Sequence, residues 1–229
     1  MELVEFLRSK VGQVVNLGEL IFATVLNMLS NVLISKDMVN LEKETEDGGM
    51  RNLVRGIAEV ASAPNISDFY PTLGKLDLQG LRKKSRDLVT KVCSNWEPIL
   101  EERRNSREGG SSSQQDFLEI LLDNGFTNDR IDQLFMELLS ACSDTSTSTI
   151  EWAMAELIKN VEWAMAELIK NVESMKKVQD ELEIELSGSD YPKEYQLLQM
   201  SYVQACVKET LRLHPPAPLL LPHRAIETF

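Results

Sequence analysis

The chain has few of the residues that cross-link a fold or bind a metal. Its 229 residues include three cysteines, Cys93, Cys142 and Cys206, which lie far apart and form no Cys-x-x-Cys pair. This odd and sparse set predicts no disulfide framework and indicates a reducing compartment. A proline-rich segment separates the two histidines, His214 and His223. We therefore expect no metal site built from these side chains.

Basic residues are outnumbered, since 24 Lys and Arg stand against 36 Asp and Glu and the formal net charge is -12. This balance argues against a nucleic-acid partner, because a protein that binds a duplex must neutralise many phosphates with basic side chains. One short basic cluster, from Arg82 to Arg86, is interpreted as a solvated helix face.

No stretch has the pattern of a secretory signal or of a membrane span. The first ten residues, MELVEFLRSK, mix acids and bases and have no apolar core. The most apolar region, residues 17–34, contains Glu19, Asn27, Ser30 and Asn31, whereas a membrane span needs about 20 predominantly apolar residues. We expect a buried helix there, no membrane span, and a cytosolic location for this chain alone.

Along most of the sequence, apolar residues recur with the period of an α-helix. Hydrophobic residues make up 43% and charged residues 26%, as in ordinary soluble domains, and apolar residues recur three or four positions apart. The chain is predicted to be all-α, with any strand confined to residues 219–222. The expected helices cover about residues 3–11, 17–34, 50–64, 78–104 with a bend at Pro98, 116–122, 128 onward, 174–186 and 202–213.

Two features interrupt this pattern. Residues 107–115, REGGSSSQQ, are predicted to be a flexible linker between residues 1–106 and 116–229. Residues 151–172 repeat the block EWAMAELIKNV twice without a change. Eleven residues turn a helix about 20° beyond three full turns, so a second copy keeps the apolar stripe in phase and lengthens a helix by roughly 16 Å. We interpret the repeat as a tandem duplication within a structural helix, because solenoids need three or more units.

Two polar motifs could carry chemistry. Five hydroxyl residues and Asp144 lie between Ser143 and Ser148 in an otherwise apolar stretch. They either cap the start of a helix or form a relay in which an acid beside a hydroxyl moves protons. Glu209 and Arg212 are three residues apart, so they can form a bidentate pair on one helix face. The apolar helix around them predicts a buried, structural pair.

Several stretches together resemble cytochrome P-450, a haem-thiolate monooxygenase. KETLRLHPPAPLLLPHRA resembles its K helix and the strand that follows, and ACSDTSTSTIEWAMAEL resembles its oxygen-binding I helix. SMKKVQDEL, between them, is similar to the J helix, and the first hundred residues are similar to the plant class that contains geraniol 8-hydroxylases. The resemblance implies a partial cytochrome P-450 fold, with residues 1–106 as a D–G-helix-like region and residues 116–229 as an H–K-helix-like region.

The resemblance also implies roles for individual residues. Thr145 and Asp144 match the catalytic pair that delivers protons, and Glu209 with Arg212 matches the family's structural pair. The remaining matches would contact the haem or line the substrate pocket. The haem-contacting set is His223, Arg224 and Ala141, and the pocket set is Ala217, Leu219 and Leu220.

By resemblance, the activity would be insertion of one oxygen atom from dioxygen into a C–H bond of a small apolar, terpenoid-like substrate. The cofactor would be haem, and electrons would come from NADPH through an NADPH–cytochrome reductase. The location would be the cytosolic face of the endoplasmic reticulum membrane.

The sequence departs from the family pattern in several places. Cys142 replaces a glycine in the oxygen groove, which its side chain would narrow, and Val161 and Val172 stand where relatives have a proline that ends the I helix. The family's Phe-x-x-Gly-x-Arg-x-Cys-x-Gly loop does not occur among the 229 residues, and neither does a membrane anchor. No cysteine is therefore assigned as an iron ligand. A catalytically dead truncated protein, or a helical interaction module without haem, stays open as the alternative.

Overall fold

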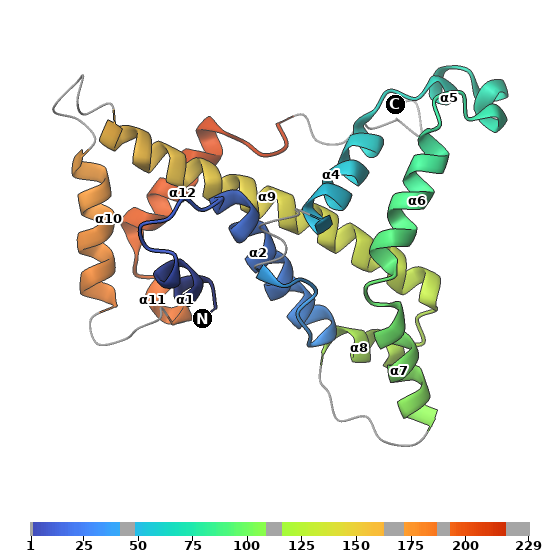
Figure 1. Cartoon of the computed structure of the whole chain (residues 1–229), viewed down its shortest axis with the longest axis horizontal. Coiled ribbons are helices and arrows are strands. Elements are labelled where there is room, and N and C mark those ends of the chain that lie inside the picture. The colour runs from blue at the N-terminus through green and yellow to red at the C-terminus, as the bar shows by residue number, and fades with distance from the viewer. Residues whose placement is uncertain (1, 42–48, 109–115, 163–171, 187–192, 219–229) are drawn as a thin grey trace, which may run out of the picture. The chain divides into compact units, whose positions relative to one another are not determined.

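A computed structural model describes residues 2–41, 49–108, 116–162, 172–186 and 193–218 (Figure 1). Every regular element in these residues is a helix, so the all-α prediction is confirmed. The short strand predicted over residues 219–222 lies outside them. The described residues form two compact units, one from residues 2–18 and 145–218 and the other from residues 19–144, and each is described by itself.

The larger unit holds most of the N-terminal helices and the first half of α9. Within it, α4 packs along α6, and the short α5 packs against the 3-10 helix η1. Its elements are α2 (Leu17–Ile34), α4 (Gly49–Ser62), α5 (Ile66–Phe69), η1 (Pro71–Leu76), α6 (Leu81–Cys93), α7 (Glu97–Glu108), α8 (Phe117–Asp123) and the start of α9 (Asn128–Glu162).

The other unit contains the rest of α9 and the C-terminal helices. Here α10 packs against α12. Glu181 of α10 accepts hydrogen bonds from the backbone N–H groups of Tyr202 (2.9 Å) and Val203 (2.8 Å), which open α12. Those N–H groups have no partner within their own helix, so a carboxylate from the neighbouring helix satisfies them. The elements of this unit are α1 (Glu2–Ser9), α10 (Val172–Glu185), α11 (Glu194–Leu197) and α12 (Ser201–Leu213).

The core of the larger unit is built around Trp96, in the turn between α6 and α7. Its side chain is 1% exposed and meets the Phe135 ring edge-on, with ring centroids 5.7 Å apart. Its indole Nε1 donates to Asp132 Oδ1 at 2.8 Å, so the buried polar atom has a partner. Phe135 and Asp132 both belong to α9, so this one side chain fixes the α6–α7 turn against α9.

This turn corrects the single helix predicted over residues 78–104. Residues 94–96 form a turn, and a new helix, α7, begins at Glu97. Pro98 therefore lies in the first turn of α7 and does not bend a continuous helix. Proline is tolerated there because the first N–H groups of a helix have no acceptor within it.

α2 is buried as the sequence predicts, and its polar residues have structural roles. Asn27 Oδ1 accepts hydrogen bonds from the N–H groups of Met38 and Val39, each at 3.0 Å, and Ser30 Oγ donates to the Lys36 carbonyl at 2.8 Å. The chain after α2 is thus tied back onto the helix. By length and composition α2 could also cross a membrane, but 56% of that window is buried.

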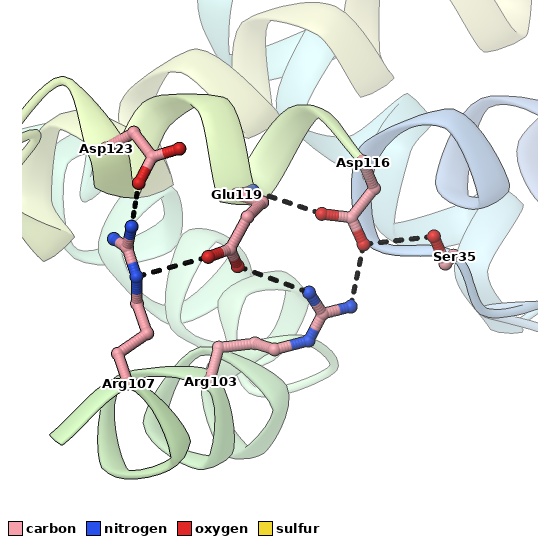
Figure 2. A network of polar contacts seen from close by, with 6 residues as sticks. All are labelled: Ser35, Arg103, Arg107, Asp116, Glu119 and Asp123. Atoms are coloured by element: carbon pink, nitrogen blue, oxygen red, sulfur yellow. Dashed lines mark hydrogen bonds and ion pairs between the residues drawn. The ribbon is translucent and has the colours of Figure 1, made fainter. Parts of the chain in front are cut away.

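Buried charges connect α7 to α8 (Figure 2). Arg103 of α7 reaches Asp116 Oδ2 at 2.7 Å, and Ser35 Oγ donates to the same oxygen at 3.0 Å. The other Asp116 oxygen accepts from the Glu119 N–H at 3.0 Å and so caps α8. The Asp116 side chain is only 2% exposed, so these donors compensate for its loss of water.

The same network extends along α8 through a second arginine. Arg107 Nε lies 3.1 Å from Glu119 Oε1, and the Arg107 guanidinium also pairs with Asp123. α7 ends at Glu108, and residues 109–115 lie outside the described residues. The predicted linker over 107–115 therefore stays a prediction for those positions.

α9 contains the whole first copy of the repeat and ends at Glu162. The second copy, residues 162–172, falls mainly outside the described residues, and α10 begins at its last residue, Val172. The lengthening of this helix by the second copy therefore stays a prediction.

Candidate functional site

The hydroxyl-rich stretch lies in the middle of α9, so it does not cap a helix start. Ser143 Oγ donates to the Leu139 carbonyl, and Thr149 Oγ1 donates to the Thr145 carbonyl at 2.9 Å. Ser143 and Thr147 are fully buried. A Ser or Thr hydroxyl inside a helix can donate its hydrogen bond to the backbone carbonyl four residues earlier. This contact slightly destabilises the helix at that point. Of the two explanations for this stretch, the cap is therefore wrong, and the relay stays a prediction.

Asp144 is paired with a residue that the sequence analysis did not single out. Its Oδ1 lies 3.7 Å from Nε of Arg55 on α4, and the two side chains are 32% and 48% exposed. Oδ1 itself is buried and accepts no hydrogen bond within the part of the chain described. At 3.7 Å this contact is longer than a hydrogen bond, so the guanidinium holds the carboxylate by the attraction of opposite charges.

The residues beside Asp144 differ in their exposure. Thr145 and Cys142 are half-buried, and Ala141 is exposed. Ala141, Asp144 and Thr145 lie within about one turn of α9, because all three belong to this helix and are at most four residues apart. Their assigned roles, and the narrowing of a groove by Cys142, stay predictions.

Glu209 and Arg212 form the predicted pair, but it is not buried. Arg212 Nε and a terminal guanidinium nitrogen reach the two Glu209 oxygens at 2.8 and 2.7 Å. The side chains are 56% and 66% exposed, so the expected burial is wrong. The apolar neighbours that suggested burial, Val207 and Leu211, are themselves 40% and 41% exposed. The Arg212 guanidinium holds the pKa of Glu209 below its usual range.

The other predicted site residues lie near the C-terminus. Ala217 is exposed, in the bent segment after α12. Leu219, Leu220, His223 and Arg224 lie outside the described residues, so their roles stay predictions.

Two of the three cysteines, Cys93 and Cys206, do not fit a haem–thiolate iron. Burial, with Asp132 and Glu97 nearby, raises the pKa of the Cys93 thiol to about 11. Burial, with Glu181 nearby, also raises the pKa of Cys206. A metal-ligating cysteine must lose its proton, which needs a positive environment and not carboxylates. The described residues also contain no group of three His, Cys, Asp or Glu side chains that could hold a metal.

Arg55 could not have been identified from the sequence. It lies on a different helix from Asp144, and no short motif connects the two positions. Only the packing of α4 and α9 in the larger unit brings the guanidinium to the carboxylate.

Comparison with known proteins identifies the family. The sequence pattern of the cytochrome P450 family matches residues 1–162 and 160–228. The chain belongs to the cytochrome P450 family. The two matched stretches meet inside the doubled block, as expected when one copy is additional to the family pattern.

Three plant P450 relatives match almost the whole chain. Corytuberine synthase of Coptis japonica is 44% identical over 99% of this chain and 44% of its own length. The probable (S)-N-methylcoclaurine 3'-hydroxylase isozyme 2 of Coptis japonica is 40% identical over 99% of the chain and 44% of its own length. The (S)-N-methylcoclaurine 3'-hydroxylase isozyme 1 of Papaver somniferum is 38% identical over 100% of the chain and 45% of its own length. The chain therefore spans about half the length of the relatives it matches.

Proposed function

We propose that the protein is a haem-dependent monooxygenase that hydroxylates a small, largely apolar substrate. The observation that carries this proposal is the match of 99% of the chain, at 40% identity, to a protein named as a 3'-hydroxylase. The family supplies oxygen activation through haem. Because the raised thiol pKa values of Cys93 and Cys206 do not suit an iron ligand, neither cysteine is proposed to bind the haem iron.

For the substrate, we propose an alkaloid of the (S)-N-methylcoclaurine type. Two relatives carry that compound in their names, and a third is named for corytuberine. The terpenoid-like substrate of the geraniol 8-hydroxylase class, expected from the resemblance, is the competing substrate class.

For the chemistry of this chain, Asp144 would accept and return a proton at its Oδ1, and the Thr145 hydroxyl would order a water beside it. Arg55 would hold the Asp144 carboxylate in place through the 3.7 Å contact. Electrons would come from NADPH through a reductase. The protein would work at the cytosolic face of the endoplasmic reticulum membrane.

A chimaera tests this proposal. Residues 1–229 replace the matched segment of the Papaver somniferum 3'-hydroxylase, and a second chimaera lacks residues 162–172 and so carries a single copy of the repeat. Each is reduced under carbon monoxide to measure its haem–thiolate band, and is then incubated with (S)-N-methylcoclaurine or with geraniol. We expect the band and hydroxylated (S)-N-methylcoclaurine, and we expect Asp144→Asn to lower product without removing the band.

The outcomes separate the substrate classes. Hydroxylation of geraniol alone would replace the alkaloid proposal by the terpenoid one. A chimaera that shows the band but oxidises neither compound would contradict both proposals.

A second candidate is that these 229 residues alone bind no haem and act as a helical interaction module. The raised thiol pKa of Cys93 and Cys206 favours it. The purified chain, incubated with haem and reduced under carbon monoxide, should then show no thiolate band, and a stoichiometric band would exclude this candidate.

A further inference from the structure

We propose that the first copy of the repeat holds the end of α12 in place through three side chains. Trp152 and Glu156 of α9 contact His214, the residue that follows α12, and we call these three residues the His214 clasp. The clasp rests on the geometry of α9 and α12 alone. Its consequence for a substrate also rests on the proposed function.

The geometry of the clasp is specific. The imidazole of His214 stacks on the indole of Trp152, with ring centroids 3.9 Å apart and ring planes 3° from parallel. His214 Nε2 lies 3.1 Å from Glu156 Oε1. Trp152 and Glu156 are four residues apart on α9, so they share one face. One imidazole can therefore contact both residues at once.

The backbone places His214 at the end of α12, where the chain changes direction. Its N–H donates to the Thr210 carbonyl at 2.7 Å, which closes the last turn of α12. Pro215 and Pro216 follow and cannot continue a helix, because proline lacks the N–H donor. The chain therefore leaves the helix at His214, and the side-chain contacts fix the direction in which it leaves.

The clasp is partly exposed, so it affects the position of the segment after α12 more than the global stability of the chain. The side chains of His214 and Glu156 are 25% and 33% exposed, and Trp152 is 39% exposed. Solvent screens such contacts. Loss of the clasp should thus loosen the segment that begins at Pro215 without unfolding α9 or α12.

The duplication supplies a matched control within the same chain. The second copy carries the same Trp-x-x-x-Glu spacing at Trp163 and Glu167, in an identical eleven-residue sequence. A substitution at Trp163 therefore changes composition, helix propensity and local sequence as the same substitution at Trp152 does. Only the place of the substituted residue in the sequence differs.

Under the proposed function, Trp152 and Glu156 become positioning residues. The segment from His214 to Ala217 leads into the positions that the resemblance assigns to the substrate pocket. By fixing His214, the first copy would set where this segment begins, although neither Trp152 nor Glu156 needs to touch a substrate.

The experiment uses the complete 229-residue chain and the ring protons of its two histidines, observed by NMR. Stacking on an indole displaces imidazole proton resonances upfield, and His214→Ala assigns the displaced set. We expect Trp152→Ala to abolish the displacement and Trp163→Ala to leave it unchanged. Displacement that persists in Trp152→Ala, or that disappears in Trp163→Ala, would overturn the proposal.

A conservative variant covers the case in which Trp152→Ala loses helix. Trp152→Phe keeps an aromatic face, so we expect a smaller upfield displacement at unchanged far-UV circular dichroism. No displacement in a fully helical Trp152→Phe chain would also overturn the clasp. Glu156→Ala and Glu167→Ala form a second matched pair. Only Glu156→Ala should shift the His214 resonances.

The consequence for the substrate is measured separately in the chimaera. Trp152→Ala should raise KM about two- to tenfold, the effect of losing one aromatic pair, and should change kcat little, whereas Trp163→Ala should change neither. The NMR result needs no haem and no substrate. A positive NMR result with an inactive chimaera would therefore contradict only the proposed function, and an active chimaera without the displacement would contradict only the clasp.

Discussion

The Arg55 guanidinium on α4 lies 3.7 Å from the Asp144 carboxylate in the middle of α9. This pair joins the residue that the family resemblance assigns to proton delivery to a residue on α4 for which no role was predicted from the sequence. The contact is longer than a hydrogen bond, and both side chains are partly exposed. It is suited to holding the carboxylate in position, and it contributes little to stability.

Replacing Arg55 should therefore affect activity more than stability. For Arg55→Gln we expect the free energy of unfolding to change by no more than about 1 kcal/mol, and hydroxylation by the chimaera to fall clearly. Lys84→Gln is the control, because it removes the more exposed Lys84–Glu59 contact (3.5 Å), which does not involve Asp144. An equal loss of activity in both variants would show that general surface charge, and not Asp144, is responsible.

Arg103→Ala, in contrast, should affect stability more than activity. It removes the main cation from Asp116, whose side chain is 2% exposed, and an uncompensated buried charge costs about 3–5 kcal/mol. We expect the lower end of this range, since Ser35 and the Glu119 N–H still donate to Asp116. Urea unfolding followed by far-UV circular dichroism measures the loss.

The control for Arg103 is an exposed ion pair near the same helices. Lys36 lies 3.7 Å from Glu102, and the two side chains are 55% and 68% exposed. Lys36→Ala should cost less than about 1 kcal/mol. If both alanine variants unfold at the same urea concentration, burial of the Asp116 network does not stabilise the chain.

Acid should weaken the start of α12 through Glu181. The N–H groups of Tyr202 and Val203 hold the pKa of this carboxyl below its usual value of 4.5. A depressed folded-state pKa gives stabilisation that is complete above the unfolded value and is lost as pH falls through the folded value. Amide exchange at Tyr202 and Val203 should accelerate below pH 4.5 relative to other helical amides.

Glu181→Gln tests the source of this pH dependence. The amide oxygen can still accept a hydrogen bond but carries no charge, so the extra acceleration in acid should disappear. Glu183→Gln, an exposed position on the same helix, should leave it unchanged. An identical acid response in the parent chain and in Glu181→Gln would exclude Glu181 as the titrating group.

Cys93 should react slowly with alkylating agents. Its pKa is raised from 9.0 to about 11, so at a fixed pH near 8 about a hundredfold less thiolate is present than in the unfolded chain. Iodoacetamide labelling, followed by mass spectrometry of the Cys93 peptide, measures the rate in the native chain and in urea. Equal rates would contradict the raised pKa and reopen Cys93 as a candidate thiolate.

Local patterns predicted most of the fold. The period of apolar residues located α2, α4, α8 and α12 to within a few residues, because an amphipathic or buried helix repeats every 3.6 residues whatever it packs against. The same reasoning was wrong at Pro98. A proline in a long apolar pattern fits both a bend and a new helix start, and only the burial of Trp96 in the preceding turn distinguishes the two.

For the candidate site, too, the sequence located some residues and the structure alone identified others. Residue type and spacing located Asp144, Thr145 and the Glu209–Arg212 pair, and these are local properties of single helices. The pair's burial could not be predicted, since the apolar character of α12 does not determine which face meets another element. Arg55 and the His214 clasp carried no sequence signal, because each joins residues on different helices.

The sequence by itself determined an all-helical chain, its family motifs and a duplication that preserves helical phase, because these depend on neighbours within a few turns. Tertiary structure alone decided which charges are paired, which thiols have a raised pKa, and that Trp152 and Glu156 contact His214. Those properties depend on distance and on exclusion of water between segments far apart in the chain.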